Sequence, residues 1–474
     1  MADTPMLKFV DREQRYPVKR LPDDRARDFR EIADRYAVPA AEEQAGRCSQ
    51  CGVPYCTVHC PLHNHIPDWL RLTAEGRLRE AYELSNATST MPEICGRICP
   101  QDRLCEGNCV VEFSGHGAVT IGSVEKFITD TAWAEGWVEP VAVGRPRGQS
   151  VAVIGAGPAG LTAAEYLRGH GYEVHVYDRH DRAGGLLTYG IPGFKLEKPV
   201  VMRRVDRLKA AGIVFHEGFA VGEDASLDEL RSRHDAVLIA TGVYKARAVD
   251  VPGADEAVAA LDYLTASNRK GFGDAVAAFD NGALDADGRH VVVIGGGDTA
   301  MDCVRTAIRQ GAASVKCLYR RDRANMPGSA REVANAEEEG AEFVWLAAPL
   351  GIEAGSVRAS RMRLGSPDAS GRRAPERDPG GDVEVAADLV IKALGFDAED
   401  LPALWDAPEL AVSRWGTVLV DGQTLMTSLD GVFAAGDIVR GASLVVWAIR
   451  DGRDVAASMH KWLKAKAARE KVAA

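Results

Sequence analysis

Two of the short unbroken hydrophobic runs in this chain lead into glycine-rich turns. The first run covers residues 151–154, and glycines follow it within residues 155–160. Apolar positions then recur at helical spacing over residues 161–168, and apolar and polar residues alternate over residues 173–178. These patterns predict a strand, a glycine turn, a helix and a second, parallel strand.

The same order returns in the second half of the chain. An apolar run at residues 291–294 leads into the glycine-rich turn at residues 295–300, a helical pattern extends through Arg309, and an apolar stretch follows at residues 314–319. The repetition predicts two separate βαβ units, each with a glycine turn between its first strand and its helix.

Other stretches complete this outline. The apolar residues 236–239 predict a strand that ends in Ala240-Thr241-Gly242, and residues 431–437 predict a strand that runs into a loop. Residues 443–459 have a helical pattern, and we assign this tail to the first βαβ unit. Residues 367–381 are rich in Gly, Pro, Asp and Arg, which predicts a solvated hairpin or loop.

The expected fold class is α/β, with a mostly helical N-terminal domain ahead of two Rossmann-like domains. Gly and Pro at residues 143–148 break regular structure and suggest a domain boundary. We therefore expect a helical domain at residues 1–148. A first Rossmann-like domain would take residues 149–250 and 403–474, and a second domain, residues 251–402, would be inserted in it.

The first glycine turn has the residues of a dinucleotide site. Gly155 permits the tight turn, Gly157 lets a pyrophosphate approach the backbone, and Gly160 allows the helix to pack closely on the strand. Asp178 ends the next predicted strand, where a carboxylate binds ribose hydroxyls. The acidic residue favours FAD at this turn over a cofactor that carries a 2′-phosphate.

The second glycine turn differs from the first at the position expected to contact the ribose of the cofactor. It begins with Gly295 and Gly297 and ends in Ala300, and the counterpart of the acidic residue is Arg320, followed by Arg321. Arginines pair with a 2′-phosphate that a carboxylate would repel, so this turn is expected to bind NADPH. The alternative is that both arginines belong to a solvated surface.

Eight of the ten cysteines lie before residue 110 in two groups. The groups are Cys48, Cys51, Cys56 and Cys60, and Cys95, Cys99, Cys105 and Cys109. Eight thiolates match the ligand count of two 4Fe–4S clusters, and Pro61 directly after Cys60 is typical of ferredoxin-type runs. Zinc is the alternative, because Cys48-x2-Cys51 alone is also the start of a zinc ribbon.

Ligation need not follow the order of the sequence. In two-cluster ferredoxins the cysteine before proline serves the other cluster. This rule assigns Cys48, Cys51, Cys56 and Cys109 to one cluster and Cys60, Cys95, Cys99 and Cys105 to the other. Cys303 and Cys317 are expected to be buried free thiols, and His59, His63 and His65 to be surface or capping residues.

Composition limits the partners. The 474 residues include 57 Lys and Arg against 68 Asp and Glu, and the net charge of −11 argues against nucleic-acid and anionic-membrane surfaces. The first residues lack a signal-peptide pattern, and no stretch has the roughly 20 apolar residues of a membrane span. A soluble cytoplasmic protein with small-molecule or protein partners is therefore expected.

Several motifs together resemble those of one family, the small (beta) subunits of bacterial NADPH-dependent glutamate synthases. The motifs are Arg47-Cys48-Ser49-Gln50-Cys51-Gly52-Val53-Pro54-Tyr55-Cys56, Ile66-Pro67-Asp68-Trp69, Pro92-Glu93-Ile94-Cys95-Gly96-Arg97-Ile98-Cys99-Pro100, Ala183-Gly184-Gly185-Leu186-Leu187-Thr188-Tyr189-Gly190-Ile191-Pro192 and Gly295-Gly296-Gly297-Asp298-Thr299-Ala300-Met301-Asp302. The resemblance extends over essentially the whole chain. Asp178 departs from the pattern, since Glu is common at that position.

The resemblance adds cofactor positions. It implies that residues 183–192 lie along the flavin, that Asp437 contacts its ribityl or pyrophosphate region, and that the helix entered through residues 443–447 points at the isoalloxazine. Around the first turn and in the tail, the expected cofactor-binding residues are Gly155, Gly157, Pro158, Ala159, Gly160, Asp178, Arg179, Gly185, Leu186, Leu187, Lys195, Thr241, Gly242, Gly436 and Asp437. Around the second turn they are Gly295, Gly297, Asp298, Thr299, Ala300, Arg320 and Arg321.

The resemblance also implies a reaction. NADPH would reduce FAD, and two 4Fe–4S clusters would carry electrons to a large (alpha) subunit with FMN, which would make L-glutamate from L-glutamine and 2-oxoglutarate in ammonia assimilation. Cofactors would carry the hydride and the electrons, so no side chain is assigned as acid or base. The alternatives are an NADPH:ferredoxin or other acceptor oxidoreductase, since dihydropyrimidine dehydrogenase shares this architecture, and a non-catalytic adaptor whose cysteines hold zinc.

Overall fold

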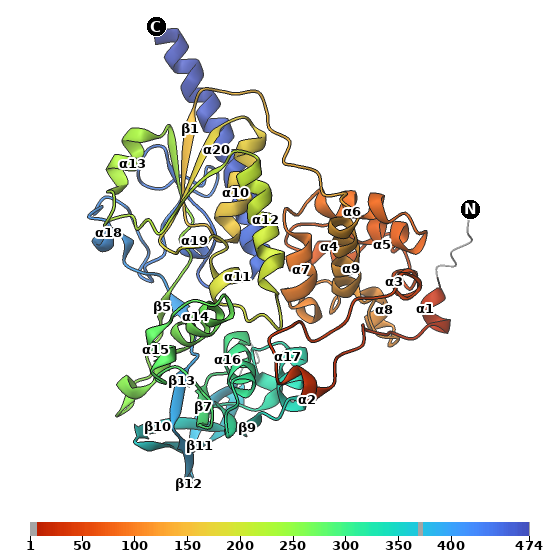
Figure 1. The fold of residues 1–474 in the computed structure, drawn as a ribbon, viewed down its shortest axis with the longest axis vertical. Coiled ribbons are helices and arrows are strands. Elements are labelled where there is room, and N and C mark those ends of the chain that lie inside the picture. The colour runs from red at the N-terminus through yellow and green to blue at the C-terminus, as the bar shows by residue number, and fades with distance from the viewer. Residues whose placement is uncertain (1–6, 368–372, 474) are drawn as a thin grey trace.

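The computed structural model describes residues 7–367 and 373–473. Figure 1 shows three lobes: the N-terminal helices on one side, a lobe that contains β1 and the long C-terminal helix, and a third lobe that contains β7. The mixture of a helical domain with parallel sheets confirms the predicted α/β class.

The N-terminal lobe, here called the cysteine-rich domain, is a group of short helices. They are α1 (Lys8–Asp11), α2 (Pro22–Arg25), α3 (Val38–Ala45), α4 (Tyr55–Val58), α5 (Ile66–Ala74), α6 (Leu78–Asn86), α7 (Pro92–Ile98), α8 (Val110–Phe113) and α9 (Ile121–Ala134), with a 3-10 turn at Gln101–Arg103. Val124 and Ile128 of α9 are fully buried and lie four residues apart, so one face of this helix packs in the core, where Trp69 is also fully buried. His59, His63 and His65 are exposed, as expected of surface or capping residues.

The second lobe is built on a five-stranded parallel sheet in the order β15-β4-β1-β2-β3. Its elements are β1 (Ser150–Ile154), α10 (Pro158–Gly169), β2 (Glu173–Asp178), α11 (Leu186–Tyr189), α12 (Lys198–Ala210), β3 (Val214–Glu217), α13 (Leu227–Arg233), β4 (Ala236–Ile239), α18 (Leu401–Leu404), β15 (Val432–Ala434), α19 (Asp437–Arg440) and α20 (Val445–Ala473). Because β15 pairs with β4, the tail returns to this sheet. Helix α20 continues well past the predicted end at residue 459 and projects from the lobe in Figure 1.

The third lobe is inserted in the second and has its own five-stranded parallel sheet, in the order β6-β13-β7-β8-β9. Its elements are β6 (Val258–Ala259), α14 (Ala260–Gly271), α15 (Ala277–Asp280), β7 (His290–Ile294), α16 (Asp298–Arg309), β8 (Ser314–Tyr319), α17 (Ala330–Glu338), β9 (Glu342–Trp345) and β13 (Leu389–Lys392), with 3-10 turns at Ala254–Glu256 and Arg323–Asn325. The chain crosses between the two sheets through β5 (Lys245–Ala246) and β14 (Phe396–Asp397), which pair antiparallel. The predicted boundaries near residues 250 and 403 lie close to these crossings and stay predictions.

A smaller antiparallel sheet, in the order β10-β11-β12, extends the third lobe. Its strands are β10 (Ala347–Glu353), β11 (Gly355–Pro367) and β12 (Arg373–Ala387), and Figure 1 shows β12 at the far end of the lobe. The solvated segment expected at residues 367–381 thus takes the form of a hairpin arm in its described part, and residues 368–372 lie outside the described residues.

Candidate cofactor sites

The first glycine turn connects β1 to α10 in a shape that leaves the backbone open. Gly155 has φ +108°, and a Cβ there would collide with the carbonyl oxygen of Ala240. A Cβ on Gly160 would collide with the carbonyl oxygen of Gly155, so the helix packs closely only because this residue is glycine. Nothing lies within 4 Å of a Cβ built on Gly157, which precedes the first residue of α10. The turn therefore offers free amide groups and a helix N-terminus to an anion.

Two adjoining cavities meet at this turn and together form one cleft. Both are lined by Gly155, Asp178, Thr241 and Tyr244. The predicted residues that line the cavity on the α20 side are Gly155, Gly157, Pro158, Ala159, Asp178, Leu186, Leu187, Thr241, Gly242 and Asp437. Residues far apart in the sequence thus converge on one space around the first glycine turn.

Asp178 is fixed at the end of β2 by backbone amides. Its Oδ2 accepts a hydrogen bond from the amide of Ala156 at 2.6 Å, and its Oδ1 accepts one from the amide of His180 at 2.8 Å. The Oγ1 of Thr241 is buried and has no hydrogen-bond partner among the described residues. A buried hydroxyl without a partner is costly, so a polar ligand group in the cleft would stabilise it. The cleft thus fits FAD.

The neighbouring predicted residues support this cleft in different ways. Arg179 forms an ion pair with Glu399 at 3.0 Å, and its guanidinium lies 4.6 Å from the centre of the Tyr244 ring. Gly185 has φ +53°, and a Cβ there would lie 2.9 Å from the Cα of Gly157. Sequence reasoning missed Tyr244, although its place two residues after Thr241-Gly242 was an available signal.

Asp437 stands at the start of α19, directly after Gly436, which has φ +80°. Burial raises the pKa of the Asp437 carboxyl to about 6, while a hydrogen bond from the backbone of Ser443 acts in the opposite direction. Asp437 and Ser443 both line the cavity on the α20 side. The carboxyl group is therefore placed to accept or donate a hydrogen bond to a ligand there.

The second glycine turn repeats the geometry between β7 and α16. Gly295 has φ +151°, and a Cβ there would collide with the carbonyl oxygen of Ala393. Nothing lies within 4 Å of a Cβ built on Gly297, and Ala300 is fully buried. The carboxylate of Asp298 accepts a hydrogen bond from the amide of Ser329 at 2.8 Å and so anchors the following loop.

The two arginines predicted to bind the 2′-phosphate follow β8. Arg320 is exposed and makes no hydrogen bond or ion pair with any described residue. The Nε of Arg321 is buried without a partner in the same part of the chain. Both guanidinium groups thus retain free donors, which suits a doubly charged phosphate and fits NADPH.

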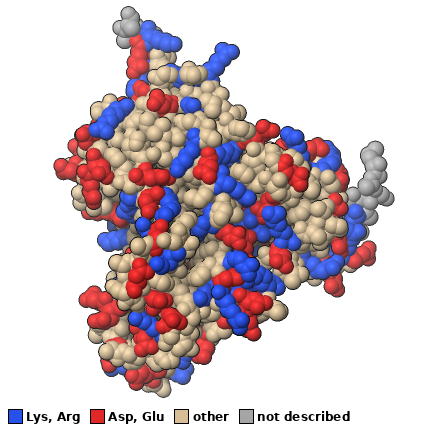
Figure 2. Space-filling model, in the orientation of Figure 1, with Lys and Arg blue, Asp and Glu red and all other residues tan. Residues whose placement is uncertain are grey.

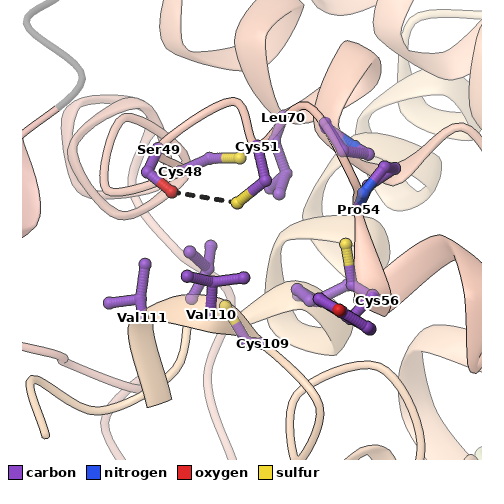
Figure 3. Close-up of a pocket in the computed structure, with 13 residues that line it drawn as sticks. Cys48, Ser49, Cys51, Pro54, Cys56, Leu70, Cys109, Val110 and Val111 are labelled. Atoms are coloured by element: carbon purple, nitrogen blue, oxygen red, sulfur yellow. Dashed lines mark hydrogen bonds between the residues drawn. The ribbon is translucent and has the colours of Figure 1, made fainter. Parts of the chain in front are cut away.

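One set of cysteines surrounds a cavity inside the cysteine-rich domain. Figure 3 shows Cys48 and Cys51 on one side of this cavity and Cys56 and Cys109 on the other. Leu70, Val110 and Val111 also line it. Cys109 therefore joins the first three cysteines of the chain, as the ferredoxin rule predicts.

Burial and polar contacts define the surroundings of these sulfurs. Burial raises the pKa of Cys48 and the pKa of Cys56 to about 12. The amide Nε2 of Gln50 donates to the sulfur of Cys48 at 3.3 Å, and the hydroxyl of Ser49 lies 3.1 Å from the sulfur of Cys51. Such thiols ionise only with a compensating cation, which an iron–sulfur cluster supplies.

Three of the four cysteines of the second set lie against the second lobe. Cys95 belongs to the hydrophobic core of that lobe, and Cys60 and Cys99 pack against it. A hydrogen bond with Cys95 and burial raise the pKa of Cys99, and burial together with the charges of Glu106 and Cys60 raises the pKa of Cys105. These effects place Cys99 beside Cys95 and Cys105 near Cys60, and Cys105 is also near Cys56. Cys60 and Cys105 pack against the core of the cysteine-rich domain, to which Cys56 and Cys109 belong.

Glu125 is a further charged residue beside the second set, and sequence reasoning missed it. Burial raises the pKa of this carboxyl to about 8. The amide Nδ2 of Asn64 donates to it at 3.3 Å. The sequence around Glu125 does not indicate that it is buried, because a glutamate in a helix is usually exposed to solvent.

Two negative findings apply to the part of the chain that is described. No group of three or more His, Cys, Asp or Glu side chains there is placed to hold a single metal ion. No helix of residues 7–367 or 373–473 is long and apolar enough to cross a membrane. Cys303 and Cys317 are fully buried, as predicted for free thiols.

Known proteins resemble this chain in both halves. A family model described as dihydropyrimidine dehydrogenase domain II, 4Fe-4S cluster, matches residues 25–137, and one described as pyridine nucleotide-disulphide oxidoreductase matches residues 149–452. The glutamate synthase (NADPH) small chain of Azospirillum brasilense is 67% identical over 98% of this chain and 98% of its own length. The chain of that name from Escherichia coli K12 is 45% identical over 97% and 99% of the two chains. Mycobacterium tuberculosis FprA in complex with NADPH shares the fold, with a TM-score of 0.56 at 21% identity over 69% of this chain and 86% of its own.

Proposed function

Because the chain belongs to the family of NADPH-dependent glutamate synthase small chains, we propose that it is the electron-input subunit of such an enzyme. It accepts a hydride from NADPH on FAD and passes electrons through two 4Fe–4S clusters to a large subunit that carries FMN. The large subunit makes L-glutamate from L-glutamine and 2-oxoglutarate. The observation that carries the proposal is the position of the second cysteine set, in which Cys95 belongs to the core of the FAD domain and Cys60 and Cys99 pack against it. This packing supports electron flow from the flavin into the clusters.

The residues of the first cleft have distinct tasks in this proposal. Gly157 and the N-terminus of α10 hold the pyrophosphate of FAD, and Asp178 holds ribose hydroxyls. Thr241 supplies its unpartnered hydroxyl, and Leu187 packs on the flavin and excludes water. When FAD is bound, its chemistry allows two electrons to enter together and to leave one at a time.

The second cleft selects the nicotinamide cofactor. The open backbone at Gly297 and the N-terminus of α16 hold the pyrophosphate, and Arg320 and Arg321 hold the 2′-phosphate. Residues 251–402 are therefore called the NADPH domain below, and residues 149–250 with 403–474 the FAD domain.

The first cysteine set supports the exit of electrons at the surface. Val53 and Tyr55, which lie between Cys51 and Cys56, are 60% and 48% exposed, and Phe113 of α8 is 68% exposed. Apolar side chains over a cluster suit a protein partner, because they exclude water when they are covered. This surface is where the large subunit docks in the proposal.

Reconstitution with the large subunit tests the proposed reaction. The chain is purified gently with its natural partner, and glutamate is measured after addition of NADPH, L-glutamine and 2-oxoglutarate. The expected result is glutamate formation that requires both subunits. Reduction of ferredoxin or another acceptor, with no large subunit recovered and no glutamate formed, would favour a general NADPH:acceptor oxidoreductase. A colourless protein that contains zinc would identify an adaptor.

A further inference from the structure

A short loop of the FAD domain reaches into the NADPH domain. It covers residues 190–197 and joins α11 to α12. At its start, Ile191 lines the flavin cavity beside Leu187. Further along, Phe194 is 1% exposed and belongs to the contact with the NADPH domain. The loop therefore touches the flavin site at one end and the NADPH domain at the other.

The aromatic contact of this loop is made with α16. The guanidinium carbons of Arg305 and Arg309 lie 4.4 and 4.0 Å from the centre of the Phe194 ring. Helix α16 begins at the open glycine turn that would hold the pyrophosphate of NADPH. Phe194 thus packs directly against the helix that begins at the second glycine turn.

The ionic contact is made by the next residue. The Nζ of Lys195 lies 2.9 Å from the Oδ1 of Asp302 and 3.7 Å from the Oε2 of Glu332, and the Lys195 side chain is 13% exposed. Asp302 is on α16, and Glu332 is on α17. Lys195 is among the expected cofactor-binding residues, and it lies outside the lining of the two cavities that form the flavin cleft.

The two arginines of helix α16 that contact Phe194 also form ion pairs. Glu339 forms ion pairs with Arg305 at 2.8 Å and with Arg309 at 2.6 Å, and all three side chains are fully buried. Arg25 of the cysteine-rich domain joins Glu339 at 3.1 Å. Figure 2 shows acidic and basic side chains interspersed where these lobes meet. Charges buried in this way resist separation, since an unpaired buried charge is costly.

We propose that Lys195, with Phe194 beside it, is a positioning residue for hydride transfer. It fixes α16 against the flavin loop and so sets the distance and angle between the nicotinamide and the flavin. This inference rests on the proposed function, because it requires hydride transfer from NADPH to FAD. Its physical basis is that reacting atoms must meet at about 3–3.5 Å and that a displacement of about 1 Å lowers the rate up to about 100-fold.

The test compares Lys195→Met with a matched control. The control is Lys209→Met, which removes a lysine of the same domain whose ion pair with Glu217 at 3.1 Å stays within that domain. Flavin reduction is followed by rapid mixing with NADPH in proteins loaded with FAD. The expected result is a limiting rate about 10- to 100-fold lower for Lys195→Met, with little change in the Kd of NADPH. The Lys195→Arg variant should recover most of the rate, and Lys209→Met should keep it.

A second readout needs no turnover. Hydrogen exchange is measured on the NADPH-free protein in peptides that cover residues 190–197 and α16. The proposal predicts faster exchange in both peptides for Lys195→Met and unchanged exchange for Lys209→Met. If Lys195→Met does not fold, Asp302→Asn breaks the same ion pair and is measured instead, with the same expected results.

Three outcomes would overturn the proposal. An unchanged limiting rate in a folded, flavin-loaded variant would show that the ion pair does not set the geometry. A higher Kd with an unchanged limiting rate would show that Lys195 binds NADPH directly. If NADPH fails to reduce the flavin of the unmodified protein, the proposed function itself is wrong, and this result is distinguishable because it does not depend on Lys195.

Discussion

Arg204 of α12 and Glu93 of α7 form a bidentate ion pair across the boundary between the FAD domain and the cysteine-rich domain. The Nε–Oε1 and Nη2–Oε2 distances are 2.8 and 2.7 Å, and both side chains are almost completely buried. Coulombic attraction and hydrogen bonds from Arg204 hold the pKa of Glu93 below its usual range against the effect of burial. The pair fixes the helix that carries Cys95 against the FAD domain.

Removal of Glu93 should weaken this boundary strongly. Glu93→Gln leaves the guanidinium of Arg204 buried without a charge partner, which costs about 3–5 kcal/mol. Chemical unfolding of the protein measures the loss of free energy. The control is Glu75→Gln, which removes the partner of the part-exposed Arg71 and should cost at most about 1 kcal/mol. Equal costs for the two variants would contradict the structural role of the buried pair.

Thr241 should contribute to the affinity for FAD. Thr241→Val keeps the shape of the side chain and removes the buried hydroxyl that has no protein partner. Loss of one hydrogen bond to the cofactor should weaken FAD binding about 10-fold, and the flavin-free protein should be as stable as before or more stable. Fluorescence titration of the flavin-free protein measures the Kd. The control is Thr131→Val. The hydroxyl of Thr131 donates a hydrogen bond to the carbonyl oxygen of Phe127 in α9, so its loss should leave the FAD affinity unchanged.

Arg320 should determine the preference for NADPH over NADH. Arg320→Ser removes an exposed guanidinium that has no partner among the described residues, so the fold should be unaffected. Loss of a charge-assisted contact with the 2′-phosphate should raise the KM for NADPH about 10-fold and leave the KM for NADH nearly unchanged. Steady-state kinetics with both cofactors measure this split. Arg289→Ser, just before β7 and away from the glycine turn, should change neither value.

The pKa of Asp437 leads to a prediction about pH. Burial raises this pKa from 3.8 to about 6 in the folded protein. Because the folded protein binds this proton more tightly than the unfolded chain, protonation of Asp437 stabilises the fold. This contribution is fully present below the unfolded pKa and is lost as the pH rises through the folded pKa. The Asp437→Asn variant has no ionisable carboxyl group at this position, so it does not lose stability in this way. In the flavin-free protein, the variant should gain stability relative to the unmodified chain as the pH rises from about 5 to 7, by about 1–2 kcal/mol. A constant difference over this range would contradict the raised pKa.

The division of the cysteines also makes a testable prediction. Cys109 lines the cavity of Cys48, Cys51 and Cys56, although Cys105 is its neighbour in sequence. Cys109→Ala and Cys48→Ala should therefore remove the same cluster, and Cys105→Ala should remove the other, each lowering iron from about eight to about four atoms per chain. Electron paramagnetic resonance of the reduced proteins identifies which signal disappears. Identical spectra for Cys109→Ala and Cys105→Ala would contradict this division.

Local chemistry explains which features were predictable from sequence. The glycine turns, their strands and helices and the acidic or basic residue at each ribose position depend on neighbours in the chain. The α/β class was therefore predicted and is confirmed, and the predicted nucleotide cofactors agree with the pyridine nucleotide oxidoreductase family that matches residues 149–452. The ferredoxin rule placed Cys109 with the first cysteines, which the cavity supports. The individual site residues stay predictions.

Long-range contacts were not predictable. The ion pair of Lys195 with Asp302 joins residues of two domains, and no local pattern states their distance. Burial of Glu125 depends on how α9 packs against the cysteine loops, and a glutamate in a helix gives no hint of it. The length of α20 was underestimated, because its last turns extend beyond the core and lack an apolar face to mark them.

Anaerobic titration of the purified chain with NADPH tests the central claim most directly. The flavin absorbance should bleach, the clusters should then accept electrons, and NADH at the same concentration should act far more slowly. Bleaching by NADPH followed by cluster reduction would support the path from nicotinamide through flavin to iron–sulfur clusters. A flavin that NADPH leaves oxidised, or clusters that stay oxidised after the flavin is reduced, would contradict it.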